Sequence, residues 1–159
     1  MDVKQQKVYL ETTVFNYYFD TDRDAHAATV KFFDEIRHGK YEAYTSAYVL
    51  AELEKASEPK RSNMINLIAS LGIELLEPEI QAENLADMYV KEGVIPRRFR
   101  LDGVHIALAS IKELDYIISL NFQHINKQKT KTYTALINKL HGYNKEIIIC
   151  SPMEVIEDE

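Results

Sequence analysis

Three acidic side chains occupy positions where a metal-dependent reaction could be carried out. Glu11 ends the apolar run KVYLE at residues 7–11, Glu52 lies in SAYVLAELEKA, and Asp102 opens LDGVHIALASIKEL. Three carboxylates in one cleft repel each other and raise at least one pKa unless a cation neutralises them. Clustered Asp and Glu suit hard cations such as Mg²⁺ or Mn²⁺, which leave coordination positions free for phosphate oxygens. The chemistry predicted is phosphodiester hydrolysis by a metal-activated water.

The elements that must position these carboxylates follow from the apolar pattern. Segments whose apolar residues recur every three or four positions predict helices, and Ser46 and Pro59 are expected to begin two of them. Parallel strands need a crossover of about a dozen residues, so alternation of strand and helix favours an α/β fold with a mostly parallel sheet. Short β-favouring runs that predict strands are found at residues 7–11, 41–46, 72–77, 115–121 and 146–151.

Polar side chains gather where three of these predicted strands end. Ligands of an open parallel sheet bind beyond the carboxyl ends of its strands, so these residues form a candidate site. They are Glu11, Thr12 and Thr13 after the first strand, Thr45 and Ser46 at the second, and Ser119 and Asn121 at the fourth. Glu52 and Asp102 are expected at the same edge because their predicted helices begin there.

Composition limits the classes of protein to consider. A length of 159 residues fits one domain, over residues 1–159, and 46% apolar with 28% charged residues is ordinary for a folded globular chain. A net charge of −6 argues against coating nucleic acid or membrane through the overall field, and the single cysteine, Cys150, excludes an internal disulfide. The polar start MDVKQQK and the absence of a long apolar stretch predict no signal peptide and no membrane span, hence a cytoplasmic protein.

Four segments together resemble the PIN domain family, which includes VapC-like toxin ribonucleases. They are VYLETTVFNYYFD, TSAYVLAELEKA, RLDGVHIALASIKELDYIISLNFQHI and IIICSPMEVI, and they cover nearly the whole chain. The resemblance implies a three-layer α/β/α sandwich with about five parallel strands. It also implies Mg²⁺- or Mn²⁺-dependent cleavage of single-stranded or structured RNA, a homodimer, and a toxin restrained by an antitoxin protein.

The resemblance also assigns catalytic roles to residues of this chain. The family's acidic positions fall on Glu11, Glu52, Asp102 and Asn121, with the first three as metal ligands. Thr13 and Ser119 match supporting hydroxyl positions. Two of these residues depart from the commonest pattern, since Glu11 and Asn121 stand where Asp is usual. The extra methylene of Glu moves its carboxylate by about 1.5 Å, and Asn removes one charge but keeps a carbonyl oxygen.

Other interpretations of the same residues stay open at this point. Asp102 also suits a helix amino terminus, Glu52 could pair with Lys55 or Lys60, and Asn121 could form a turn. His105, three residues after Asp102, is treated as a packed or hydrogen-bonded helix residue and is left out of the site. Arg97, Arg98 and Arg100, and also Lys127, Lys129 and Lys131, could steer phosphates or simply be solvated.

Two functions therefore follow from the sequence. The first is a metal-dependent endoribonuclease, and the second is a catalytically degenerate PIN-like module that binds RNA or a protein partner without cutting. The departures at Glu11 and Asn121 are the reason for keeping the second. A phosphate-accepting receiver domain is disfavoured, because YLETT lacks a pair of carboxylates and IIICSP lacks a lysine.

Overall fold

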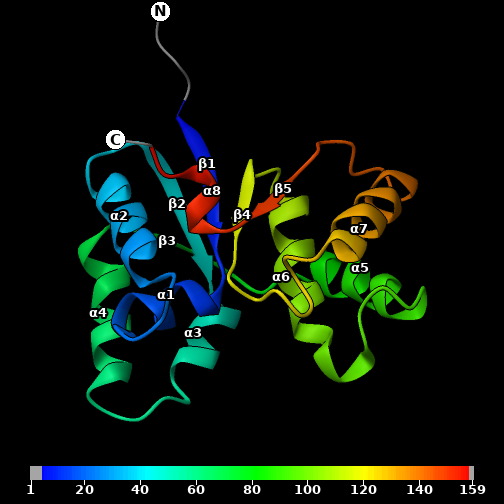
Figure 1. Cartoon of the computed structure of the whole chain (residues 1–159). Helices are drawn as coiled ribbons and strands as arrows, with labels where there is room; N and C mark the ends of the chain where they lie inside the picture. Colours follow the sequence, from blue (N-terminus) through cyan, green and yellow to red (C-terminus); the bar gives the residue numbers. More distant parts are fainter. Residues whose placement is uncertain (1–4, 158–159) are drawn as a thin grey trace, which may run out of the picture.

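A single parallel sheet organises the fold. The computed structural model describes residues 5–157, and its strands lie in the order β3-β2-β1-β4-β5 (Figure 1). These are the five predicted strands, three of them shorter than expected, so the prediction of a five-stranded parallel sheet is confirmed. Their bounds are β1 (Gln6–Leu10), β2 (Tyr41–Ser46), β3 (Glu74–Leu76), β4 (Tyr116–Ile118) and β5 (Ile148–Cys150).

Helices cover both faces of this sheet, as Figure 1 shows. One side carries α1 (Thr12–Phe19), α2 (His26–Arg37), α3 (Ala47–Leu53) and α4 (Lys60–Ser70). The other side carries α5 (Ile80–Lys91), α6 (Arg100–Ile111) and α7 (Gln128–Leu140). The short η1 (Arg97–Phe99) precedes α6, and α8 (Pro152–Val155) follows β5. The three-layer α/β/α arrangement is thus confirmed, and no helix within residues 5–157 is long and apolar enough to cross a membrane.

The winding of the chain reverses beside the central strand. Strands β1, β2 and β3 follow one another toward one edge, after which the chain returns to place β4 on the other side of β1. Leu10 of β1 pairs with Ile118 of β4, so both strands end at the same level. In doubly wound sheets, ligands bind beyond the strand ends at such a reversal. We use the word crevice below for this region of the fold, where the residues after β1 and β4 meet.

Two helices begin at this crevice without an intervening loop. Glu11 is the N-cap residue of α1, so the chain passes from strand to helix at the carboxylate. Ser46 ends β2 and caps α3, because its Oγ accepts a hydrogen bond from the Val49 N–H at 3.2 Å, as predicted. Pro59 directly precedes α4, also as predicted. The crevice is therefore lined by the first turns of helices.

The helix that carries Asp102 is almost entirely enclosed. Every residue of α6 from Gly103 to Ser110 is buried, which is typical of a helix covered on all sides. A β-carbon on Gly103 would lie 3.3 Å from side-chain atoms of both Ile95 and Tyr89, so this residue allows close packing. This packing fixes the first turn of α6, and therefore Asp102, relative to the sheet.

A buried polar network joins the three helices on this side. Tyr89 of α5 donates a hydrogen bond to the Asn138 side-chain oxygen in α7. The Asn138 amide donates to Ser110 Oγ of α6 at 2.9 Å, and this hydroxyl donates to the Ile106 carbonyl at 2.8 Å. Each group is buried, so losing one member leaves another without a partner.

We predict that Tyr89→Phe lowers the free energy of unfolding by about 1–3 kcal/mol, because it leaves the buried Asn138 oxygen unsatisfied. Urea denaturation followed by circular dichroism measures the change. Tyr133→Phe on the exposed face of α7 is the matched control and should leave stability within about 0.5 kcal/mol of the parent. Equal stability of the two variants would contradict the structural role of this network.

Candidate active site

Glu11 lies buried at the end of the central strand and is held by two hydroxyl groups. Thr13 Oγ1 donates to its Oε1 at 2.5 Å, and Ser119 Oγ donates to the same oxygen at 2.7 Å. Only 3% of Glu11 is exposed. Burial raises the pKa of this carboxyl, while His105 and the two hydroxyls oppose the rise. The supporting residues predicted from the sequence, Thr13 and Ser119, therefore contact the first acidic residue directly.

Glu52 faces the same crevice from α3 and accepts two hydrogen bonds. Its Oε1 accepts from Thr12 Oγ1 at 2.7 Å and lies 2.7 Å from His105 Nε2. Burial raises the pKa of this carboxyl, but the hydrogen bond and charge of His105 outweigh that effect, so its pKa is lowered overall. Lys60 instead pairs with Asp20 at 2.9 Å. The alternative in which Lys60 forms an ion pair with Glu52 is therefore wrong.

His105 connects Glu52 to the interior of the sheet. Its Nδ1 lies 2.7 Å from the Tyr9 hydroxyl, which lies 2.7 Å from Ser46 Oγ. Tyr9, Ser46 and His105 have no exposed surface. In the neutral ring with its proton on Nε2, the Ser46 hydroxyl donates to Tyr9, Tyr9 donates to Nδ1, and Nε2–H donates to Glu52. This chain of hydrogen bonds fixes one carboxylate oxygen of Glu52.

The sequence interpretation missed this role of His105. It correctly described a buried, hydrogen-bonded helix residue, but it left His105 out of the site although the imidazole contacts a candidate metal ligand. A spacing of three residues puts Asp102 and His105 on the same face of α6, and this is the signal that could have identified the role. Acidic neighbours raise the pKa of His105 against the effect of its burial, Glu52 first among them.

Asp102 and Asn121 form the third part of the site. Asp102 lies in the first turn of α6, and the Asn121 side chain is hydrogen-bonded to its carboxylate. Asn121 Oδ1 accepts from the His124 N–H at 3.0 Å, so the amide nitrogen is the group that donates to Asp102. Burial raises the pKa of Asp102, and Glu52 adds to that rise. Asn121 thus both shapes the turn after β4 and contacts an acidic residue.

The chemistry of the donor set fits a hard divalent cation. The negative charge of Glu52 raises the pKa of both Glu11 and Asp102, so the three carboxylates share one electrostatic environment. Carboxylate and amide oxygens are the ligands that Mg²⁺ and Mn²⁺ prefer. Each carboxylate is, however, turned toward its own hydrogen-bond donors. Within residues 5–157, no group of three or more His, Cys, Asp or Glu side chains is arranged to hold a metal ion.

The three arginines before Asp102 do not share one environment. Arg100 pairs with Asp87 at 2.5 Å and lies 3.8 Å from Glu83, which anchors it to α5. Arg97 lies near enough to Asp87 for its charge to lower the pKa of that carboxyl. Arg98 instead lies over the Phe99 ring, with its guanidinium carbon 5.0 Å from the ring centre.

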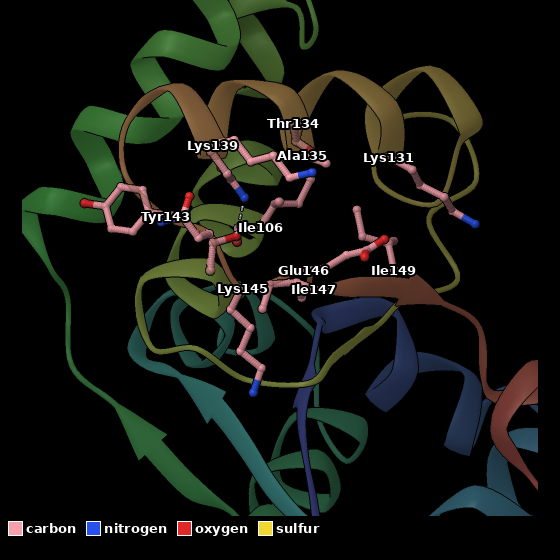
Figure 2. Close-up of a pocket in the computed structure, with 13 residues that line it drawn as sticks. Ile106, Lys131, Thr134, Ala135, Lys139, Tyr143, Lys145, Glu146, Ile147 and Ile149 are labelled. Carbon is pink, nitrogen blue, oxygen red and sulfur yellow. Dashed lines mark hydrogen bonds between the residues drawn. The ribbon is translucent and has the colours of Figure 1, made fainter.

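A hollow elsewhere in the fold has different surroundings. Figure 2 shows it between α6, α7 and the segment 143–149, with Lys131, Lys139 and Lys145 at its margin. Its volume of about 50 Å³ holds a few water molecules, whereas ligand pockets occupy several hundred Å³. None of the residues predicted for the active site lines it, and Lys145 pairs with Asp115 at 2.8 Å. This hollow is therefore not the candidate active site, which we place at the ends of β1 and β4 because the predicted site residues meet there.

Comparisons with known proteins bear on the fold. No family model and no curated protein matches the sequence. Among solved structures, VapC20 of Mycobacterium tuberculosis, described as a toxin that cleaves the sarcin–ricin loop, superposes with a TM-score of 0.59. The match covers 74% of this chain and 92% of VapC20 at 11% sequence identity. Together with the strand order and the reversal beside β1, this likeness shows that the chain has the PIN-like fold.

Proposed function

We propose that this protein is a metal-dependent endoribonuclease that hydrolyses RNA phosphodiester bonds. One observation carries the proposal: where the winding of the sheet reverses, Glu52 is hydrogen-bonded both to Thr12, the residue after Glu11, and to His105, one turn after Asp102. Buried like charges at such a crevice favour a cation there. The fold shared with VapC20, itself described as a toxin that cleaves the sarcin–ricin loop, supports the same conclusion.

The cofactor in this proposal is Mg²⁺ or Mn²⁺, held by Glu11, Glu52 and Asp102. Such an ion lowers the pKa of a bound water and polarises a phosphoryl oxygen. Both hydrogen bonds of Glu11 and both of Glu52 go to Oε1. Glu11 and Glu52 would therefore each have a second carboxylate oxygen, outside these four hydrogen bonds, to offer to such an ion.

The chain's own residues orient the carboxylates in this scheme. Thr13 and Ser119 restrain Glu11, Thr12 and His105 restrain Glu52, and Asn121 restrains Asp102. Metal ligands held by such outer hydrogen bonds lose affinity or activity by about 10- to 100-fold when the outer partner is removed. In this proposal Asn121 acts in catalysis by positioning Asp102.

The biological setting is part of the same proposal. The protein acts as the toxin of a toxin–antitoxin pair in the cytoplasm, forms a homodimer, and is restrained by an antitoxin protein. The description of VapC20 as a toxin supports this setting by analogy of fold. In this proposal RNA approaches along Arg97 and Arg98, which lie in η1 just before α6, the helix that carries Asp102. Arg100 contributes through its pairing with Asp87, which orients the start of α6.

A second candidate function is binding without cleavage. The observation that favours it is that Glu11, Glu52 and Asp102 each satisfy protein donors and do not surround a common point in the described residues. A PIN-like module of this kind would bind RNA or a protein partner and would need no ion. Metal dependence therefore separates the two functions.

We predict that Asp102→Asn lowers RNA cleavage at least 100-fold, because a metal supplies several kcal/mol of transition-state stabilisation. The measurement is cleavage of a labelled RNA with Mn²⁺, and with Mn²⁺ plus excess chelator, which should abolish it. Asp22→Asn, an exposed change of the same chemistry, should cleave like the parent. Equal cleavage in all metal conditions and by Asp102→Asn would reject a metal-dependent nuclease that uses Asp102.

We further predict that Asn121→Asp weakens the fold without metal and that Mn²⁺ restores it. The change replaces a donor to Asp102 with a second negative charge, a loss of about 1–2 kcal/mol. For a chain of this length that lowers the melting temperature by roughly 2–8 °C. Thermal unfolding in chelator and in Mn²⁺ measures it. A melting temperature that Mn²⁺ leaves unchanged in both proteins would favour the binding module.

A third prediction concerns His105. His105→Leu removes the donor that restrains Glu52 and should raise the Mn²⁺ concentration for half-maximal cleavage about 10- to 100-fold. His105→Gln keeps an amide donor and should recover part of that loss. Direct Mn²⁺ binding, followed by electron paramagnetic resonance, should shift in parallel. If all three proteins bind Mn²⁺ equally well, His105 does not position the metal ligand.

A further inference from the structure

Helix α7 exposes a row of large apolar side chains on its outer face. Its inner face, which packs on the fold, consists of the buried residues Thr130, Thr134, Ile137 and Asn138. On the outer face, Tyr133, Leu136 and Leu140 are 48%, 52% and 75% exposed. They follow one another at spacings of three and four residues, so they form one stripe along the helix. These three residues are called the outer stripe below. A surface helix normally presents polar residues there.

The outer stripe leads to a groove between α5 and the end of α7. The volume of this groove is about 320 Å³. Leu140 directly precedes His141, which lines one wall, and Ile80 directly precedes Gln81, which lines the other. Ile80 is itself 75% exposed. The remaining lining residues are Asn84, Leu85, Met88 and Tyr143. Apolar surface is therefore concentrated on one side of the fold.

The charge around the outer stripe is positive, although the chain as a whole is acidic. Residues 116–145 include five lysines but no Asp or Glu, in a chain with 25 acidic residues. Lys129 and Lys139 are exposed near the two ends of the stripe. Within residues 5–157 neither lysine forms an ion pair, and none of the residues lining the groove is acidic. A complementary ligand has an apolar face with negative charges beside it.

The pattern of the outer face favours a helix as that ligand. Positions separated by four, three and four residues form the seam of paired helices, and this is the spacing of Lys129, Tyr133, Leu136 and Leu140. Nucleic acid would contact the lysines through its phosphates and leave the leucines exposed to water. A second copy of α7, paired in either direction, would bring lysines near lysines, and like charges repel.

We propose that the outer stripe and the groove beside it form a docking site for an amphipathic, acidic helix of another protein. The apolar residues of that helix pack on Tyr133, Leu136 and Leu140, and its carboxylates pair with Lys129 and Lys139. The 13 residues of α7 extend over about 20 Å. The partner therefore contributes about four helical turns.

The docking site is separate from the candidate active site. Helix α7 connects the parallel strands β4 and β5, so it starts near their carboxyl ends and returns toward their amino ends. Leu140 is in its last turn, whereas Glu11 and Asn121 lie beyond the carboxyl ends of β1 and β4. A helix bound at the outer stripe leaves the crevice open. The inference is therefore independent of the proposed function and concerns a partner that binds without blocking the site.

The test uses the full-length protein and two synthetic peptides of about three heptads. Both peptides carry leucine at the a and d positions; one carries glutamate at e and g, and the other carries lysine there. Binding is measured by the fluorescence anisotropy of the labelled peptides. The glutamate peptide should bind at least 10-fold more tightly than the lysine peptide, and added salt should reduce this difference. The net charge of −6 would by itself favour the lysine peptide.

Variants of the outer stripe locate the bound peptide. Leu136→Ser and Leu140→Ser should each weaken binding of the glutamate peptide about 5- to 20-fold, because each removes apolar area from the contact. Lys139→Glu should reduce the preference for the glutamate peptide. The matched controls are Met153→Ser and Lys55→Glu, two exposed positions on other helices or loops, which should bind like the parent. Circular dichroism checks that every variant is folded.

Several results would overturn the inference. It fails if neither peptide binds, if both bind equally, or if the control variants weaken binding as much as the stripe variants. It also fails if the parent is a dimer that Leu136→Ser and Leu140→Ser dissociate, as shown by analytical ultracentrifugation, because a second copy then covers the stripe. Binding of phosphatidylserine vesicles through Leu140, without binding of the glutamate peptide, would overturn it in favour of a membrane surface.

Discussion

The burial of Glu11 at the end of the central strand is the constraint on which the rest of the site depends. A carboxylate removed from water needs donors, and two hydroxyl groups supply them. Thr13 Oγ1 also accepts from the Leu120 N–H at 2.8 Å, and Ser119 Oγ accepts from the Asn121 N–H at 3.0 Å. The two hydroxyls that satisfy Glu11 therefore also fix the backbone after β4, including the residue that contacts Asp102.

A second set of hydrogen bonds ties the scaffold to Glu52. Ser46 both caps α3, the helix that carries Glu52, and bonds the Tyr9 hydroxyl within the sheet. Tyr9 in turn contacts His105 on α6, which reaches Glu52 from the opposite layer. One central tyrosine thus sets the relation between the two helices that contribute acidic residues. The site and the core are held by the same groups, so a mutation in either affects both.

The sequence predicts the architecture because it depends on local patterns. Short apolar runs identify the strands, and apolar residues that recur every three or four positions identify the helices between them. Ser46 and Pro59 mark the starts of two helices. The edge at which Glu11 and Ser119 meet follows from parallel topology. The sequence cannot show which side chains from different layers of the sandwich become hydrogen-bond partners. From the sequence, Glu52 could pair with a nearby lysine. Only the tertiary arrangement of α1, α3 and α6 brings Thr12 and His105 within hydrogen-bond distance of it.

The two departures from the commoner acidic pattern act in opposite ways. Asn121 removes one negative charge and gives Asp102 a donor, while Glu11 keeps its charge but reaches its donors through one more methylene. With His105 between the acidic residues, the crevice holds three carboxylates whose repulsion is already reduced by protein groups. These hydrogen bonds supply donors to the carboxylates from the protein itself. The departures therefore reduce the repulsion that a cation would otherwise offset, and they keep oxygen atoms of the kind that Mg²⁺ and Mn²⁺ prefer.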